Sequence, residues 1–302
     1  MFKLSPLLLA LALVLSVGSA GASSPGFATI NTESGFGKLF ALAADGHGNL
    51  YVDDQVYYTI DKISAAGHLL RRYPMPSNCG ISGVAATNAG TVYAVPNCRS
   101  QVYRFLPSGR LIQKFGKQPN ANGVAVDAQG HVYVAYAGTG PKSPPPGSKV
   151  KMFSNRFVEF SPTGQVLRTV ALPGTSNAFG IAVGRGGNVY VSTQGALVEV
   201  SAAGRIVKRW PALRAATNGL PLQPAVDASG AVYALGPARS VTKISSAGTI
   251  TSAFVKAGNA PADVENPTGL AVSGNHLFVA DSRAIVIKEF TLQGKLVAEL
   301  TS

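Results

Sequence analysis

The fold can be worked out from GVAVDAQGHVYV at residues 123–134, because five related stretches accompany it along the chain. They are ALAADGHGNLYV from Ala41, GVAATNAGTVYA from Gly83, GIAVGRGGNVYV from Gly180, QPAVDASGAVYA from Gln223 and the shorter GLAVSGNHLFV from Gly269. Their shared aromatic residue recurs at spacings of 42, 40, 57, 43 and 45 residues, at Tyr51, Tyr93, Tyr133, Tyr190, Tyr233 and Phe278. Such a period indicates a ring or an array built from similar units.

A second stretch follows each of these copies at a similar distance. The six examples are KISAAGHLL from Lys62, RFLPSGRLI from Arg104, EFSPTGQVL from Glu159, EVSAAGRIV from Glu199, KISSAGTI from Lys243 and EFTLQGKLV from Glu289. Both stretches alternate apolar and polar residues around a glycine-containing turn, as hairpins do. Each unit therefore has four strands, which we name a, b, c and d in chain order. Six such units predict an all-β fold, a six-bladed β-propeller of four-stranded antiparallel blades.

The last repeat resembles that of a known family. PTGLAV at residues 267–272, FVAD at 278–281 and KEFTLQGK at 288–295 resemble an NHL repeat, and the other five copies resemble it more loosely. The resemblance covers nearly the whole chain and implies a TolB-like six-bladed propeller. Propellers of this kind include binding modules, sensors and several enzymes, so the resemblance implies an architecture and no particular reaction.

Composition agrees with a turn-rich β protein. Charged residues make up 13% of the 302-residue chain, which also contains 34 glycines and 19 prolines. These values argue against a coiled coil and against a charge-rich disordered chain. The formal net charge of +12 favours an anionic partner over a cationic one.

The N-terminus has the pattern of a secretory signal. Lys3 precedes the apolar run LLLALALVL at residues 7–15, and the small residues Ala20-Gly21-Ala22 fit a cleavage site. The alternative is a membrane anchor, although the run is short for a bilayer span. We expect a signal peptide at residues 1–22, an N-terminal extension at 23–38 and the propeller at 39–302, in a secreted or periplasmic protein. Because blade six has its own strand d, residues 25–38 are expected to cap or extend an edge of the ring.

Cys79 and Cys98 are the two cysteines of the chain. In an exported protein such a pair is more often a disulfide than a metal or catalytic site. Both residues fall in loops on one face of blade two, which permits the approach that a disulfide requires. The alternative is a pair of free buried thiols.

The order of the strands sorts the loops between two faces. The a–b and c–d turns emerge on what we call the bottom face, and the b–c and d–a loops emerge on the top face, where related propellers usually bind ligands. All four histidines fall in bottom-face turns, namely His47, His68, His131 and His276. Because a histidine-ligated zinc site or a Ser-His-Asp triad needs converging side chains, this placement disfavours both.

Two columns of carboxylates have a structural interpretation. Asp45, Asp127 and Asp227 directly follow strand a, where Asp commonly closes a turn through its own backbone. A strand-c column contains Glu159, Glu199 and Glu289 together with Lys62, Arg104 and Lys243. A position that accepts either sign of charge indicates a solvated or inter-blade face rather than a general-acid pair.

The segment NGVAVD at residues 122–127 resembles the metal-binding repeat of regucalcin and gluconolactonase-type hydrolases. The resemblance implies that Asn122 ligates a divalent cation, with Glu33 as a loose match to a first-blade ligand. The aspartate of that family is missing, because the corresponding positions hold Ser82, Phe179, Leu222 and Thr268. A hard cation held by this reduced set would bind weakly, so we expect no cofactor and keep a divalent cation as the alternative.

The top face is expected to be basic. Its b–c loops carry one arginine in each of four blades, at Arg99, Arg156, Arg239 and Arg283. The long third repeat adds GTGPKSPPPGSKVKM at residues 138–152, with Lys142, Lys149 and Lys151. Asn120, Asn177 and Asn266 each precede the strand-a glycine by three residues and add polar groups near the channel. The long loop is either a tolerated insertion or part of a ligand site.

Two functions compete on these observations. The first is an exported, non-catalytic binding or scaffold propeller that contacts a protein or an anionic polymer through its top face. The alternative is a metal-dependent lactonase-like hydrolase or lyase with a channel site near Asn122. Nucleic acid is disfavoured as a partner, because the repeated aromatics occupy columns expected for packing instead of exposed stacking positions. We expect a monomer.

Overall fold

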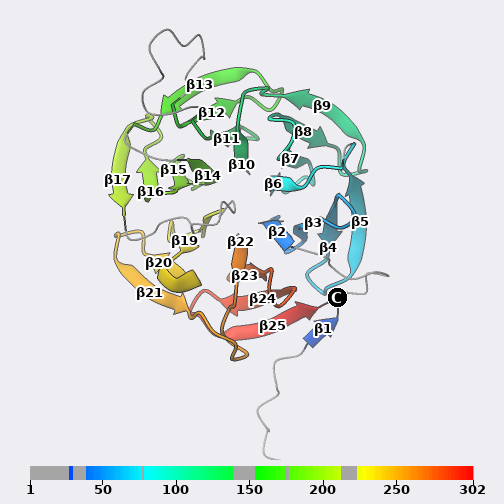
Figure 1. Ribbon diagram of the computed structural model, residues 1–302, viewed down its shortest axis with the longest axis vertical. Coiled ribbons are helices and arrows are strands. Elements are labelled where there is room, and N and C mark those ends of the chain that lie inside the picture. The colour runs from blue at the N-terminus through cyan, green and yellow to red at the C-terminus, as the bar shows by residue number, and fades with distance from the viewer. Residues whose placement is uncertain are drawn as a thin grey trace, which may run out of the picture.

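The computed structural model describes residues 27–29, 39–76, 78–138, 154–173, 177–211 and 223–301. Within these residues the strands form six antiparallel sheets of four consecutive strands, arranged as blades around a central axis (Figure 1). One 3-10 turn, η1 (Pro237–Arg239), is the helical element of the described residues. The six-bladed, all-β architecture that the repeats predict is confirmed.

Each blade takes four strands in chain order, from the axis outward. Blade one consists of β2 (Leu39–Ala44), β3 (Leu50–Asp54), β4 (Thr59–Ile63) and β5 (Leu69–Pro74). Blade two consists of β6 (Ile81–Ala86), β7 (Val92–Pro96), β8 (Val102–Phe105) and β9 (Leu111–Phe115). Blade three consists of β10 (Ala121–Val126), β11 (Val132–Tyr136), β12 (Arg156–Phe160) and β13 (Val166–Ala171).

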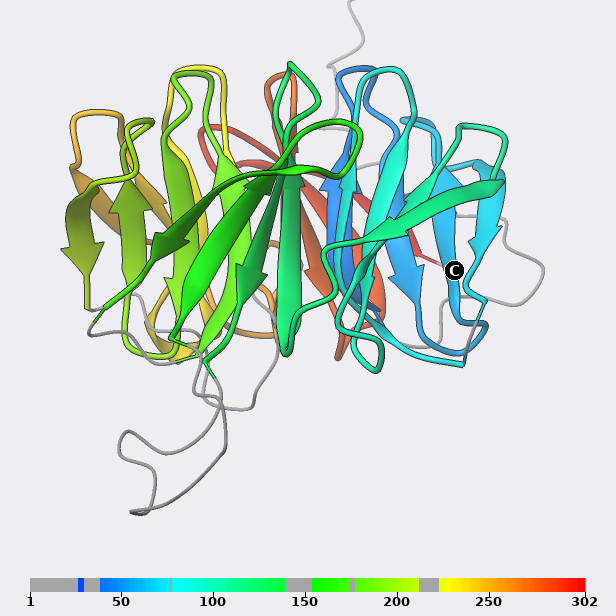
Figure 2. The ribbon, with the colours of Figure 1, turned by 90° about the horizontal axis from the view of Figure 1, so that it is seen from above.

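The second half of the ring repeats this order. Blade four consists of β14 (Ala178–Val183), β15 (Val189–Thr193), β16 (Leu197–Val200) and β17 (Ile206–Trp210). Blade five consists of β18 (Ala225–Val226), β19 (Val232–Leu235), β20 (Val241–Ile244) and β21 (Ile250–Val255). Blade six consists of β22 (Pro267–Ser273), β23 (His276–Asp281), β24 (Val286–Thr291) and β25 (Leu296–Thr301). Figure 2 shows from the side that the strands run between the top and bottom faces of the disc.

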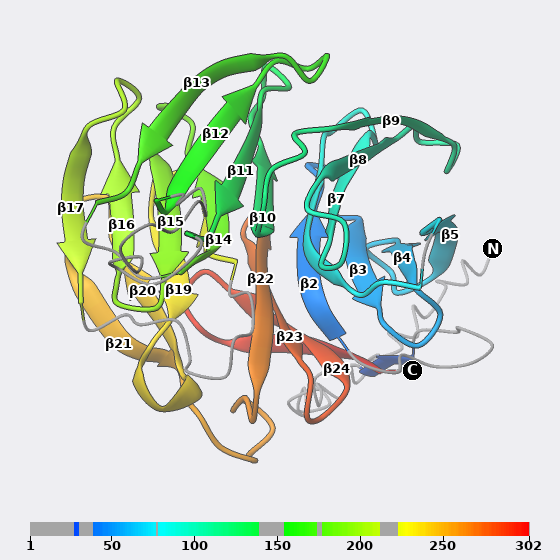
Figure 3. The same ribbon diagram turned by 45° about the horizontal axis from the view of Figure 1, so that its top comes forward.

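Burial decreases from strand b to strand d. In β3, β7, β11 and β15 all five residues are buried, because neighbouring blades cover both faces of strand b. In β5, β9, β13, β17 and β21 most side chains are partly or fully exposed, since these strands form the outside of the ring (Figure 3). The near-continuous apolar runs of strand b and the charged strands d follow from this geometry.

The strand-a glycines permit close approach of neighbouring blades at the axis. A Cβ atom on Gly123 would overlap the carbonyl oxygen of Phe179, and one on Gly83 would lie 2.8 Å from the carbonyl oxygen of Asn122. Any side chain at these positions would push the innermost strands apart. Glycine in the repeat therefore reflects packing at the axis.

The Asp column is structural, as predicted. Asp45 accepts hydrogen bonds from the backbone amides of His47 (2.9 Å) and Asn49 (3.0 Å), which closes the a–b turn. It also accepts one from the buried Tyr51 hydroxyl at 3.1 Å. Asp227 and Tyr233 repeat the second contact at 3.1 Å. The aromatic column thus packs between blades and anchors the turns of the bottom face.

Blade six closes the ring with four strands of its own. Its Thr268 hydroxyl donates to the carbonyl oxygen of Leu39 in blade one at 3.0 Å, and Phe278 shares a hydrophobic cluster with Leu42. The short strand β1 (Phe27–Thr29) pairs in parallel with β25 on the outer edge of this blade. The N-terminal segment therefore extends an edge, as expected, and does not complete a blade.

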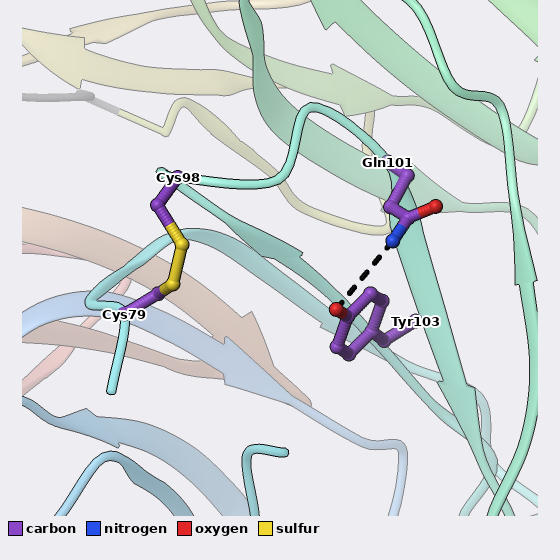
Figure 4. Close-up of a disulfide and its surroundings, with 4 residues drawn as sticks. All are labelled: Cys79, Cys98, Gln101 and Tyr103. Carbon is purple, nitrogen blue, oxygen red and sulfur yellow. Dashed lines mark hydrogen bonds between the residues drawn. A yellow bond between two sulfur atoms is a disulfide. The ribbon is translucent and has the colours of Figure 1, made fainter. Parts of the chain in front are cut away.

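Cys79 and Cys98 form the predicted disulfide (Figure 4), with Cα atoms 5.8 Å apart. The bond joins the d–a loop that enters blade two to the b–c loop of the same blade. Near it, the Gln101 side chain donates to the Tyr103 hydroxyl at 3.5 Å. Among the described residues we find no helix with the length and apolar character needed to cross a membrane.

Candidate functional site

A cavity of 260 Å³ opens at the mouth of the central channel on the top face. It is lined by Phe40, Gln55, Ile81, Ser82, Asn97, Asn122 and Phe179, from blades one to four. These residues lie at the start of strand a in four blades and in b–c loops, which meet on this face. We call this space the channel-mouth cavity.

Register along strand a places four of these side chains at the mouth. Phe40, Ser82, Asn122 and Phe179 are the second residues of β2, β6, β10 and β14, and each is partly exposed between buried neighbours. Alternation along a strand directs such a residue away from the blade interior. Since blades one and four lie opposite each other in a ring of six, Phe40 and Phe179 line opposite sides of the channel.

Two amide side chains of the cavity use their nitrogen atoms to bind the protein itself. Asn122 Nδ2 donates to the carbonyl oxygen of Ala178 at 2.7 Å, and Gln55 Nε2 donates to Asp53 Oδ2 at 3.2 Å. In this arrangement the carbonyl oxygen of Ala178 and the carboxyl oxygen of Asp53 accept from the two amide nitrogens. The carbonyl oxygen and the second N–H of each amide are left to bind a ligand.

Asp53 supports Gln55 from below the cavity and is fully buried. Burial raises the pKa of its carboxyl well above the ordinary value; the hydrogen bond from Gln55 opposes this shift, and the charge of Asp54 adds to it. Asp53 is therefore a positioning residue without access to solvent.

Gln223 crosses the channel below the mouth. Its Nε2 atom donates to the carbonyl oxygens of Val84 (3.3 Å) and Val124 (3.1 Å), which belong to blades two and three, whereas Gln223 leads into blade five. A smaller cavity of 130 Å³ near the bottom face is lined mainly by alanine and valine from all six blades, together with Gln223. The mouth is thus lined by amide, hydroxyl and phenyl side chains, whereas small aliphatic side chains line most of the lower channel.

The metal ligands suggested by the lactonase resemblance are not assembled by the described residues. Asn122 lines the cavity, but Glu33 lies outside the described part of the chain. Thr268 occupies the matching position in blade six, where it is buried and hydrogen-bonded to Leu39. The described residues contain no group of three His, Cys, Asp or Glu side chains able to hold a metal ion.

The three predicted asparagines connect neighbouring loops through hydrogen bonds and do not line the cavity. The backbone oxygens of Asn120, Asn177 and Asn266 accept hydrogen bonds from the amides of Ala137 (2.9 Å), Gln194 (3.1 Å) and Ser282 (3.0 Å). Each bond ties the d–a loop of a blade to its b–c loop. The left-handed backbone of Asn120 (φ 58°) and Asn177 (φ 34°) explains the preference for asparagine.

The predicted arginines divide into three situations. Arg99 and Arg239 are exposed in b–c loops, and Arg283 forms an ion pair with Glu265 at 2.9 Å. The prediction that Arg156 lies in a loop at the rim is wrong. Arg156 is the first residue of β12 and is only 6% exposed, and its guanidinium donates to Gln118 Oε1 at 2.8 Å. Packing over the ring of Tyr136 removes it from the rim. Lys142, Lys149 and Lys151 lie outside the described residues.

A groove of 390 Å³ lies between blades three and four and includes Tyr133, Glu159 and Arg168. Glu159 is paired with Arg168, and the Tyr133 hydroxyl donates to both Asp127 (3.1 Å) and Glu159 (3.3 Å). His131 Nδ1 lies 3.0 Å from Asp127 Oδ2. The charged groups of this groove are thus mutually satisfied, in agreement with the structural interpretation of their columns.

Sequence reasoning identifies only part of the channel-mouth cavity. Asn122, Ser82 and Phe179 stand in the column that precedes the strand-a glycine, and that column is the signal that finds them. Phe40 is missed because blade one has Ala41 in place of the glycine. Gln55 and Asn97 lie in b–c loops of different sequence, where no column exists.

No protein-family model matches the sequence, and no curated protein matches it. Similar solved structures include a streptogramin B lyase, with 13% identity over 93% of this chain and 85% of that chain and a TM-score of 0.59. A virginiamycin B lyase from Staphylococcus aureus has 17% identity over 88% and 84%, with a TM-score of 0.56. A chain of a nidogen/laminin complex has 16% identity over 87% and 92%, with a TM-score of 0.60.

The protein is a six-bladed β-propeller. Its similarity to these structures is consistent with the TolB/NHL-like architecture that the last repeat resembles. At these identities the similarity shows the fold alone. The neighbours of the propeller include both lyases and a protein–protein complex, so they do not choose between catalysis and binding.

Proposed function

We propose that the propeller is an exported, non-catalytic binding protein that contacts a protein or an anionic polymer through its top face. The observation that carries this proposal is the channel-mouth cavity, lined by amides, one hydroxyl and two phenyl rings, with Arg99 two residues beyond Asn97 in the same loop. No lining residue is an acid, a base or a histidine. Such a surface binds by shape and hydrogen bonds, and lacks groups for proton transfer.

Export is part of the proposal. The apolar run at residues 7–15 and the small residues that follow have the pattern of a secretory signal. The Cys79–Cys98 disulfide supports the same compartment, because disulfides persist in oxidising environments.

A lyase reaction is not favoured at the mouth. One similar solved structure is a catalytically inactive variant of the Staphylococcus aureus virginiamycin B lyase, in which a single histidine is replaced by alanine. In the present chain the four histidines lie at bottom-face turns, and none lines the channel-mouth cavity. The second candidate is a lactonase-like hydrolase with a cation on Asn122 Oδ1, favoured only by the placement of that atom in the cavity.

The test compares matched pairs of charge reversals. Retention on immobilised polyglutamate, which represents an acidic protein or polymer, is measured from low to physiological salt. Arg99→Glu with Arg239→Glu is expected to weaken binding about tenfold at low salt, with the difference shrinking as the Debye length falls to ~8 Å. The control pair, Arg110→Glu with Arg205→Glu, changes exposed arginines in bottom-face turns. Equal losses from both pairs would show non-specific attraction and refute a top-face site.

Metal analysis distinguishes the lactonase-like hydrolase from the binding protein. Purified protein is expected to contain no stoichiometric calcium or zinc that a chelator removes, and to leave lactones intact. A bound cation that is lost from an Asn122→Ala variant would reverse the ranking of the two functions.

A further inference from the structure

The channel-mouth cavity presents amide and hydroxyl groups between aromatic walls. Asn122 Nδ2 and Gln55 Nε2 each donate one hydrogen bond within the protein, at 2.7 Å and 3.2 Å, which leaves the carbonyl oxygen and the second N–H of each amide for a ligand. Phe179 and Phe40 line it from opposite blades. The lining has no charged side chain, and a hydroxyl group, which both donates and accepts, can pair with its amides and with the Ser82 hydroxyl.

The positive charge lies outside this space. Arg99 is exposed and follows Asn97 by two residues, and the Cys79–Cys98 disulfide ties their loop to the loop that ends at Ile81. Both Asn97 and Ile81 line the cavity, so the disulfide fixes the wall from which Arg99 extends. The top face thus combines a neutral pocket that can bind hydroxyl groups with a cationic rim.

We infer that the ligand is an acidic polysaccharide, with one sugar residue seated in the channel-mouth cavity. Its hydroxyl groups donate to Gln55 Oε1 and Asn122 Oδ1, its apolar C–H face packs on Phe179, and the carboxylate or sulfate groups of adjoining residues bind Arg99. This inference rests on the proposed function and names its ligand class.

Size and chemistry suit a sugar ring in the cavity. The volume of 260 Å³ is just under the roughly 300–1,000 Å³ range of pockets for drug-sized ligands, which suits a single ring. A sugar carries donors around its edge and an apolar face, which match this lining.

Gly80 gives the polar wall its shape. A Cβ atom at this position would lie 3.0 Å from Asn97 Nδ2 and 3.1 Å from Gln55 Nε2, so both amides pack against bare backbone. Asp53, fully buried, accepts the hydrogen bond that orients Gln55. The acceptors are therefore held in place before any ligand binds, which lowers the entropic cost of binding.

The experiment uses the full disulfide-bonded protein and an immobilised panel of oligosaccharides with uronate, sulfated and neutral members, together with polyglutamate as a polyanion without sugar. Acidic oligosaccharides are expected to bind more tightly than polyglutamate at the same charge and salt. Phe179→Leu and Gln55→Leu are expected to weaken this binding about tenfold without changing retention on polyglutamate. Tyr57→Leu, a change at an exposed top-face aromatic outside the cavity lining, is the matched control, and thermal unfolding checks that every variant is folded.

The outcomes separate this inference from the proposed function. If polyglutamate binds as tightly as every oligosaccharide and responds only to Arg99→Glu and Arg239→Glu, the sugar is wrong and top-face anion binding stands. If no oligosaccharide binds at low salt, the sugar inference is refuted. If binding requires calcium that coordinates Asn122, direct hydroxyl recognition is refuted in favour of a cation site.

Discussion

The Thr268 hydroxyl donates a 3.0 Å hydrogen bond to the carbonyl oxygen of Leu39, across 229 positions of the chain. It links the first strand of blade six to the first strand of blade one, so it is part of the seam where the ring closes. Thr268 is 1% exposed, and its partner oxygen has no access to bulk water that would compensate for loss of the bond.

Thr268→Val is therefore expected to destabilise the propeller. The variant keeps the side-chain shape and leaves a buried acceptor unpaired, which costs about 1–3 kcal/mol. Urea unfolding at neutral pH measures the change. Thr251→Val, on the exposed outer strand β21, is the control and is expected to change the free energy of unfolding by less than about 0.5 kcal/mol. Equal effects of the two variants would show that the seam bond is not needed for closure.

Packing at the axis is tested by adding one methyl group. Gly123→Ala is expected to destabilise the protein by about 1–3 kcal/mol or more, because the new Cβ overlaps the carbonyl oxygen of Phe179 in the next blade. Gly186→Ala is the control, since a Cβ there meets nothing within 4 Å. Differential scanning calorimetry of both variants gives the comparison. A Gly123→Ala protein as stable as the control would mean that the blades can move apart freely.

The disulfide is expected to stabilise the protein through the unfolded state. Replacing Cys79 and Cys98 with serine reopens a loop of 19-residue separation and is expected to cost about 3 kcal/mol. Denaturant unfolding with and without reductant measures the effect. A thiol assay under non-reducing conditions is the direct check, because two reactive thiols in the purified protein would contradict the bond.

The pH dependence of stability contains a contribution from Asp53. Burial raises the pKa of this carboxyl above its ordinary value of 3.8. The folded state therefore binds the proton more tightly than the unfolded state, so this contribution is complete below about pH 4 and is lost as pH rises through the folded-state pKa. Asp53→Asn is expected to flatten the decline in the free energy of unfolding as pH rises above about 4.

Asp227→Asn provides a contrast of opposite sign. Burial acts to raise the pKa of Asp227, but hydrogen bonds from Ser229, Ala231 and Tyr233 outweigh it and lower the pKa below 3.8. Its stabilisation is present above that value and is lost as pH falls through the folded-state pKa. Urea midpoints measured across the pH range distinguish the two variants. A steeper decline toward high pH in Asp53→Asn than in the wild type would refute the buried-acid interpretation.

Much of the fold was predictable because its determinants are local and repeated. The aromatic column recurs in all six repeats, and the turn aspartates and strand-a glycines recur in register in several of them, so the copies indicate the same strand order independently. The loops of the top face do not repeat. That Gln55 and Asn97 line the same cavity therefore follows only from the folded ring, in which blades one and two lie side by side.

Arg156 shows that a residue's position in the sequence does not determine its burial. Its place after the long third-repeat loop predicts a rim residue, yet β12 begins with it and its side chain is buried against Tyr136 and Gln118. The rim prediction fails because the strand begins earlier than the loop pattern implies.

The number of blades, the strand order and the pairing of Cys79 with Cys98 can be read from the chain alone, because each depends on a periodic local pattern or on loops of one blade. Which polar groups face the channel and which are used internally emerges only in the folded ring. Hydrogen bonds such as Asn122 to Ala178 and Gln223 to Val84 join different blades. Contacts of that kind depend on how the ring curves, and no periodic pattern in the chain encodes them.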